Sequence, residues 1–388
     1  MKHFLTLAII LFQFILSTSA QTNFVLKGKV TDQETSEGIA FVSIGIEGTY
    51  LGTATNPDGN FELKIPAEHR SGNLYLSAIG YVNKSFPISG FLQEQTITIK
   101  LVPQSYKIEE VEVAAESKVL QRILRTASER IPENYQTGPV NMKIYGDKRT
   151  SSDNLASRGE KYIFRIYDAK GYSMPSWADA FKSRTYQILE AERPQPAQSF
   201  RDASLQIDEL LETDLARLAN TILNPDLLSD YQLHMESKTR FNGDSVWIIS
   251  YEAGKKDLAH TGSFYPESFR GKIYISISDY AILRNEIHVS EIKSNPQGRS
   301  LAVKSDPNIN TQVNITVGYK KLLGKYVLAF IDSEKQYTSA DKQLIYESWK
   351  LSVLEVNTQN PTVISGRDYF ADIQPNPEFW KNFTVTLK

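Results

Sequence analysis

The run Asn56-Pro57-Asp58-Gly59-Asn60-Phe61-Glu62-Leu63-Lys64-Ile65 decides the fold of the first part of the chain. Proline presets the backbone φ angle, glycine tolerates a positive φ, and asparagine or aspartate bonds its own backbone, so residues 56–60 predict a hairpin turn. The residues after the turn alternate apolar and polar side chains, which is the period of a half-buried strand. A calcium site at Asp58 is the alternative, but no repeated aspartate spacing accompanies it.

Strand-like segments surround this hairpin at short, regular intervals. Strands spaced in this way, about seven in all, are typical of a β-sandwich, and we expect one over residues 24–101. The other segments are Phe24 to Val30, Ala40 to Glu47, Gly52 to Thr55, Leu74 to Tyr81 and Thr96 to Leu101.

These residues resemble the carboxypeptidase-regulatory-like domain, a prealbumin-like or Ig-like β-sandwich. The resemblance rests on Gly28 to Asp32, Gly48 to Phe61 and Ala78 to Tyr81. It implies an accessory domain without catalytic residues. Domains of this family are often fused in front of outer-membrane receptors and other proteins of the Gram-negative cell envelope.

The composition narrows the classes of function. Of the 388 residues, 43 are lysine or arginine and 45 are aspartate or glutamate, which gives a net charge of -2. That balance provides no basic surface for nucleic acid. The chain has no cysteine, which excludes disulfides, thiolate chemistry and cysteine-bound zinc. Its length suits two domains.

Residues 1–20 have the pattern of a secretory signal peptide. Lys2 gives a positive start, Phe4 to Leu16 is mostly apolar, and small residues precede the cleavage that we place between Ala20 and Gln21. The apolar run is shorter than the roughly 20 residues that cross a bilayer. We therefore expect export to the periplasm, or an outer-membrane-associated or extracellular location, without a transmembrane segment in the mature chain.

Residues 102–135 are predicted to contain a linker and a helix. Ile108 to Val113 alternates apolar and acidic residues, which favours an exposed strand; a motif for an energy-transducing periplasmic partner is the alternative. Val119 to Ile131 has apolar residues at helical spacing, and Ser117 and Pro132 are placed to begin and end that helix.

Residues 136–388 are predicted to form a larger, β-rich α+β domain. Turn-rich gaps join several strand-like segments, so we expect a curved antiparallel sheet, or a half-barrel, with one or two helices against its concave face. Asp208 to Leu223 is predicted to be a helix and Ser173 to Ser204 an irregular stretch. The predicted strands are Val140 to Tyr145, Lys161 to Tyr167, Tyr231 to Glu236, Ser245 to Tyr251, Gly271 to Ser278, Ala281 to Ile292, Gln312 to Leu322, Tyr326 to Gln336 and Leu344 to Leu354. The fold class is thus mainly β with a few helices.

This second part resembles an uncharacterised domain that follows the same accessory sandwich in envelope proteins. The matching pieces are Ile131 to Tyr135, Tyr167 to Tyr172, Gly271 to Ile275, Asp279 to Arg284 and Glu378 to Asn382. The hairpin around residues 271–286 is also similar to one in periplasmic lipoprotein carriers with a half-open β-barrel. That likeness implies an apolar cavity inside the curve of the sheet.

Histidine and carboxylate patterns identify no catalytic residue, metal site or cofactor. His288 and Glu291 have the spacing that metallocarboxypeptidases use for zinc, but residues three apart on a strand point to opposite faces. No histidine follows to serve as a third ligand. His234 and Glu236 are too few ligands for a metal. The sequence also lacks a nucleophile elbow, a phosphate-binding loop and a dinucleotide fingerprint.

Aromatic residues give the candidate ligand contacts. Tyr172, Trp177, Phe181 and Tyr186 lie in or beside the predicted irregular stretch, where they either contact a ligand or fold over the core. The favoured function is a secreted, non-catalytic envelope protein that binds a glycan, a peptide or a protein partner. The alternatives are a carrier of an apolar ligand and an unrecognised hydrolase, which would need titratable groups converging in a pocket.

Overall fold

The structure is a computed structural model. It describes residues 24–47, 49, 51–56, 58–92, 96–106, 113–152, 155–173, 184–192, 207, 210–241, 244–263, 266–292, 310–338, 342–364 and 376–383. The chain divides into two compact units, which we describe one at a time. The first consists of Met1–Ala78 and Val82–Pro103, and the second of Ile79–Tyr81 and Gln104–Lys388.

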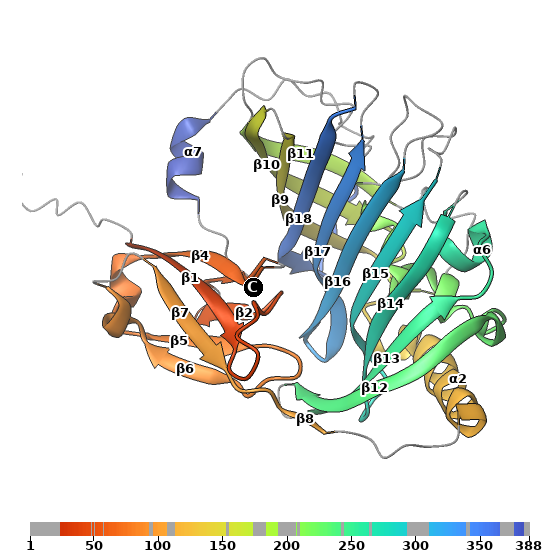
Figure 1. The fold of residues 1–388 in the computed structure, drawn as a ribbon. Helices are drawn as coiled ribbons and strands as arrows, with labels where there is room; N and C mark the ends of the chain where they lie inside the picture. The colour runs from red at the N-terminus through yellow and green to blue at the C-terminus, as the bar shows by residue number, and fades with distance from the viewer. Residues whose placement is uncertain are drawn as a thin grey trace, which may run out of the picture. The chain divides into compact units, whose positions relative to one another are not determined.

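The first unit is a sandwich of two small sheets (Figure 1). In one sheet the central strand β1 pairs antiparallel with β4 and parallel with β7; the other sheet has the order β3-β2-β5-β6. Leu26 and Leu63 of the first sheet and Ile44 and Leu74 of the second are almost fully buried, so both sheets contribute to the core. The elements are β1 (Phe24–Asp32), β2 (Ser43–Ile46), β3 (Gly52–Ala54), β4 (Asn60–Ile65), η1 (Ala67–His69), β5 (Asn73–Ser77), β6 (Lys84–Pro87), η2 (Ile88–Phe91) and β7 (Ile97–Leu101).

The turn before β4 has the geometry that its sequence predicts. The Asn60 amide donates a hydrogen bond of 2.7 Å to the Asn56 side chain, and Gly59 has a φ of 83°. A Cβ atom on Gly59 would lie 2.5 Å from the carbonyl oxygen of Val30, so a larger residue would clash there and strain the backbone. The predicted sandwich is confirmed, with β6 as a strand that the sequence patterns missed.

The second unit is built on one large antiparallel sheet (Figure 1). Its strand order is β11-β10-β9-β18-β17-β16-β15-β14-β13-β12-β8, and the described strands do not close into a barrel. The strands are β8 (Ser105–Tyr106), β9 (Val140–Ser152), β10 (Leu155–Asp168), β11 (Arg184–Glu192), β12 (Tyr231–Phe241), β13 (Asp244–Ala253), β14 (Pro266–Ser276), β15 (Ile282–Glu291), β16 (Thr311–Leu322), β17 (Lys325–Thr338) and β18 (Leu344–Asn357). The prediction of a mainly β chain with a large antiparallel sheet is confirmed.

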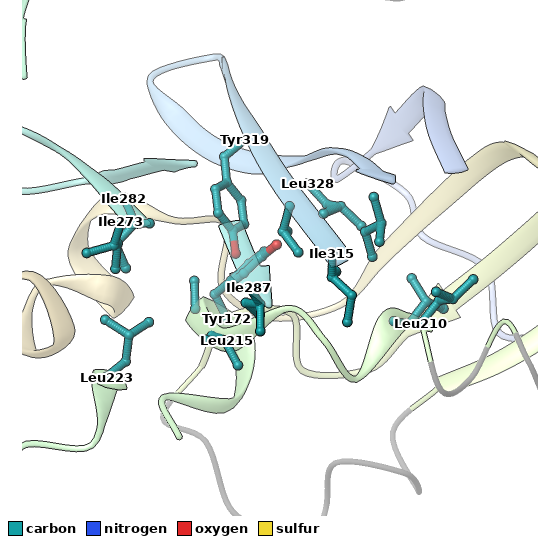
Figure 2. Close-up of a cluster of buried hydrophobic side chains, with 14 of the residues drawn as sticks. Tyr172, Leu210, Leu215, Leu223, Ile273, Ile282, Ile287, Ile315, Tyr319 and Leu328 are labelled. Atoms are coloured by element: carbon teal, nitrogen blue, oxygen red, sulfur yellow. The ribbon is translucent and has the colours of Figure 1, made fainter. Parts of the chain in front are cut away.

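Helices and single helical turns cover one side of this sheet, which we call the inner face. Figure 2 shows Leu210, Leu215 and Leu223 of the covering segment beside strand residues such as Ile273 and Ile315. The helical elements on this side are α2 (Val113–Glu129), α3 (Ile131–Asn134), α5 (Leu215–Leu218), η3 (Thr221–Leu223), η4 (Leu228–Asp230) and α6 (Leu258–Thr261). The remaining helix, α7 (Pro377–Asn382), has no buried residue and does not belong to this layer. The described part of the inner face is therefore filled by apolar side chains, whereas alternate strand residues point to the opposite, outer face.

Three local predictions need correction. The expected helix at 208–223 is broken into short turns, because Asp214 caps a new turn and Ala219 and Thr221 have positive φ angles of 44° and 48°. The stretch expected to be irregular contains β11. Ser117 lies inside α2, which already begins at Val113 and ends before Pro132. Residues 107–112, where an exposed strand was expected, lie outside the described residues.

Among the helices that the structure describes, none is long and apolar enough to span a membrane.

Candidate binding site

The aromatic residues singled out in the sequence do not share one surface where the structure describes them. The hydroxyl of Tyr172 donates a hydrogen bond of 2.7 Å to Asp214 Oδ2, and its ring lies 4.8 Å from the ring of Tyr135. Tyr186 is buried on β11. Both described tyrosines are core residues in this structure. Trp177, Phe181, Ala20 and Gln21 lie outside the described residues.

A buried ion network fixes the covering segment to the sheet. Asp168, at the end of β10, accepts hydrogen bonds from Arg184 Nε at 3.0 Å and from Arg217 Nε at 2.7 Å. The amides of Lys170 and Gly171 also donate to Asp168, each at 3.0 Å. Burial alone would raise the pKa of Asp168, but the two guanidinium groups outweigh burial and lower the pKa to about 2. The carboxylate is therefore ionised, and both of its oxygens accept hydrogen bonds from groups inside the protein.

A second buried carboxylate holds the same segment. Asp214 accepts hydrogen bonds from Tyr172 at 2.7 Å and from Tyr319 at 2.6 Å. Burial and the nearby Asp214 charge raise the pKa of both tyrosines well above the ordinary value, so their hydroxyls stay protonated donors. The members of both networks are buried and bonded to one another, so we assign the networks a structural role.

The cavity beside these networks is small. Asp168, Tyr172, Arg184 and Arg217 line part of it, and its volume is about 10 Å³. A cavity of about that size holds one water molecule at most. An apolar ligand carrier would need a roomy cavity on the inner face, and the described residues of that face are instead packed together.

The His-x-x-Glu pair does not form a metal site. His288 is exposed and its Nδ1 lies 2.8 Å from Asn314 Oδ1, whereas Glu291 is buried and bonded to Ser263. The two side chains point to opposite faces of β15, as their spacing predicts. No group of three or more histidine or acidic residues able to hold a metal occurs within the described ranges.

An open groove lies on the outer face of the sheet, over strands β12 to β15. Its volume is about 830 Å³, within the roughly 300–1,000 Å³ that small-ligand sites occupy. Polar and charged side chains of both signs line it: Gln232, His234, Ser250, Glu252, Arg270, Lys272 and His288, with Ser117 of α2 at its side. The groove is the best candidate for a ligand site among the described residues because it combines volume, exposure and charge.

The strand register arranges these side chains in two rows. Gln232, Glu252, Arg270 and His288 are successive cross-strand partners in the first row. His234, Ser250 and Lys272 form the second row in the same way. Neighbouring strands are about 4.8 Å apart and alternate residues along a strand about 7 Å apart, so each charged group has others within reach of one small ligand.

Several lining charges already have partners. Lys272 Nζ lies 3.7 Å from Glu236, and His234 Nδ1 lies 3.3 Å from Glu116 of α2. Glu252 and Arg270 differ: the side chain of neither has an ion pair or hydrogen bond with another residue that the structure describes. The centre of the groove therefore presents a carboxylate and a guanidinium that are both available.

The edge of the sheet next to the groove is occupied at three positions of β12. As an edge strand, β12 would leave backbone amides unpaired on the side away from β13. There, Glu116 Oε1 accepts a hydrogen bond of 2.7 Å from the Met235 amide. β8 pairs with β12 at Thr239 and Lys238. A ligand therefore meets side chains on the outer face and has no free strand edge to extend at these positions.

Comparison with known proteins supports the identity of the first part of the chain. Residues 26–113 match the family model of the CarboxypepD_reg-like domain, which confirms the resemblance seen in the sequence. No curated protein matches the chain.

Solved structures give a remote likeness. The chain is similar to an outer membrane lipoprotein-sorting protein domain, so described, from Vibrio parahaemolyticus, with 12% identity, a TM-score of 0.25, and 62% of this chain and 93% of that chain covered. A LolA superfamily protein from Nitrosomonas europaea has 11% identity and a TM-score of 0.20, with 63% and 97% covered. A DUF1329 family protein from Desulfovibrio piger has 12% identity and a TM-score of 0.22, with 62% and 92% covered. At these TM-scores the likeness carries no functional argument.

Proposed function

We propose that this chain is an exported, non-catalytic protein of the cell envelope that binds a charged, peptide-like partner in the groove of the outer face. The observation that carries the proposal is the groove itself, with about 830 Å³ of space lined by charges of both signs. The pattern of residues 1–20 supports export. The resemblance of the first domain to the accessory sandwich implies no catalytic residues there, which is consistent with a binding role.

The chemistry of the groove favours a peptide over a glycan. Sugars are commonly held by stacking on exposed aromatic rings, but the aromatic residues that line this groove, Tyr231 and Tyr251, are buried. The exposed lining consists of charged, amide and imidazole groups, which recognise ionic and amide groups of a partner. Such contacts set specificity more than affinity, so we expect a selective and reversible interaction.

The experiment compares three forms of the full chain on a column. The wild type, the groove variant Arg270→Gln/Lys272→Gln and the control variant Arg240→Gln/Lys238→Gln are immobilised and exposed to a tryptic digest of an envelope fraction. The control residues are exposed on β12 and do not line the groove. Retained peptides are then identified by mass spectrometry.

The proposal expects one set of charged peptides on the wild type and the control variant, and loss of that set from the groove variant. The retained peptides should elute with unchanged masses, because the Ser250 hydroxyl beside His234 donates to the backbone carbonyl oxygen of His234 and not to its imidazole. Identical retention by all three forms would refute the proposal. New cleavage products that depend on the wild-type protein would show a hydrolase instead.

A further inference from the structure

Opposite charges that face each other across neighbouring strands close into ion pairs at some positions of this protein. Lys27 and Glu62 are cross-strand partners in the first unit, and their charged atoms lie 3.1 Å apart. Lys161 and Glu192 are partners in the second unit, at 2.6 Å. Both pairs are solvent-exposed, so exposure by itself does not keep such charges apart.

Glu252 and Arg270 remain open, as do the register partners Lys148 and Glu160. Glu252 and Arg270 are direct partners in the register of β13 and β14, both are exposed, and they have no ion pair with each other. An exposed pair of this kind would contribute only about 0.2–1 kcal/mol to stability. Leaving it open therefore costs the fold little, while each charge keeps its full capacity for a ligand.

We propose that the groove recognises a zwitterionic stretch of a short peptide, in which a carboxylate and an ammonium group lie a few ångströms apart. Arg270 would take the carboxylate, since a guanidinium matches a carboxylate with two parallel hydrogen bonds. Glu252 would take the ammonium group. The inference rests on the proposed function and adds the charge pattern of the ligand.

The neighbouring side chains support the binding of the carboxylate at Arg270 and of the ammonium group at Glu252. His288 is the partner of Arg270 on β15, and its Nδ1 is held by Asn314 Oδ1, which leaves Nε2 as a further polar contact on the Arg270 side. Lys272 lies two residues along the same strand and adds a second cation on that side, with its Nζ 3.7 Å from Glu236. On the other side, Gln232 is the partner of Glu252 on β12 and brings no positive charge to compete for the carboxylate.

The test uses three tetrapeptides with acetylated N-termini and amidated C-termini, so that side chains supply every charge: Glu-Lys-Glu-Lys, Glu-Glu-Glu-Glu and Lys-Lys-Lys-Lys. Binding to the full chain is measured by isothermal titration calorimetry at low salt. We expect the mixed peptide to bind most tightly. Arg270→Gln and Glu252→Gln should each weaken it about tenfold, because each removes a charge-assisted contact.

Arg240→Gln serves as the control, because it removes an exposed arginine of β12 from outside the groove and should leave binding unchanged. Tryptophan fluorescence during urea unfolding verifies that each variant is folded. If Glu252→Gln leaves the affinity for the mixed peptide unchanged or raises it, the groove is a site for anions alone; the zwitterion inference fails while the proposed function stands. If no tetrapeptide binds the wild type, the inference also fails, and retention of envelope peptides on the column decides the proposed function independently.

Discussion

The buried network around Asp168 should control the stability of the second unit. Asp168→Asn keeps the shape of the side chain but leaves Arg184 and Arg217 inside the protein without their shared counter-charge. Removing one member of a buried ion pair costs roughly 3–5 kcal/mol. The pKa of Asp168, lowered to about 2 from 3.8, independently corresponds to about 2–3 kcal/mol. We therefore expect a loss of about 3 kcal/mol or more at neutral pH.

Intrinsic fluorescence measures this loss selectively. All four tryptophans, Trp177, Trp247, Trp349 and Trp380, belong to the second unit, so their emission during urea unfolding reports on that unit alone. Glu192→Gln is the matched control, because it neutralises a carboxylate whose ion pair with Lys161 is exposed. The control should change the free energy of unfolding by only about 0.2–1 kcal/mol.

The pH dependence gives a second readout. Because the folded pKa of Asp168 lies below its unfolded value, its contribution is present above about pH 4 and is lost as the pH falls toward 2. The advantage of the wild type over Asp168→Asn should shrink over that range. A loss no larger than that of Glu192→Gln at pH 7 would refute the reasoning, because it would mean that the buried guanidinium groups do not need the carboxylate.

Three further outcomes can be checked with the same unfolding assay. Burial disfavours the charged form of His260, but hydrogen bonds to Asp257 and Asp230 outweigh burial and raise the pKa of His260. The wild type should therefore exceed His260→Gln in stability by more at pH 6 than at pH 8.5. An equal stability difference at both pH values would contradict this. Burial raises the pKa of Asp332 to about 7, so ionisation of Asp332 opposes folding. Asp332→Asn should therefore raise the midpoint of urea unfolding at pH 8 but hardly at pH 4. An unchanged midpoint at pH 8 would count against this prediction. Leu323 is 81% exposed in a turn with a φ of 49°, so Leu323→Asn should stabilise the protein by about 1 kcal/mol, and destabilisation would show that the leucine is needed there.

The sequence predicts elements well where the signal is local. The turn at 56–60 and the alternating strands are confirmed because a turn depends on a few adjacent residues and a strand on a period of two. The helix predicted at 208–223 is absent for a physical reason. Most apolar residues of this segment recur at helical spacing because they face one core, and they do so from several short turns that Asp214 and Ala219 separate.

The candidate site could not be predicted from the sequence in the same way. Glu252 and Arg270 are neighbours only through the register of β13 and β14, and a shift of one residue would send one of them to the inner face. The pairing of Asp168 with Arg217 likewise joins a strand end to a distant turn. The aromatic candidates were chosen by their place in a long predicted loop, but Tyr186 belongs to a strand and Tyr172 to the core.

The contact between Glu116 and the Met235 amide has a consequence for self-association. Unoccupied amides at the edge of a sheet recruit strands from other molecules and start aggregation. Here a helix side chain occupies one of these amides, and the short strand β8 covers the positions further along. Pairing of another strand at Met235 therefore requires Glu116 of α2 to withdraw first, which ties edge pairing at this position to the local unfolding of a single helix.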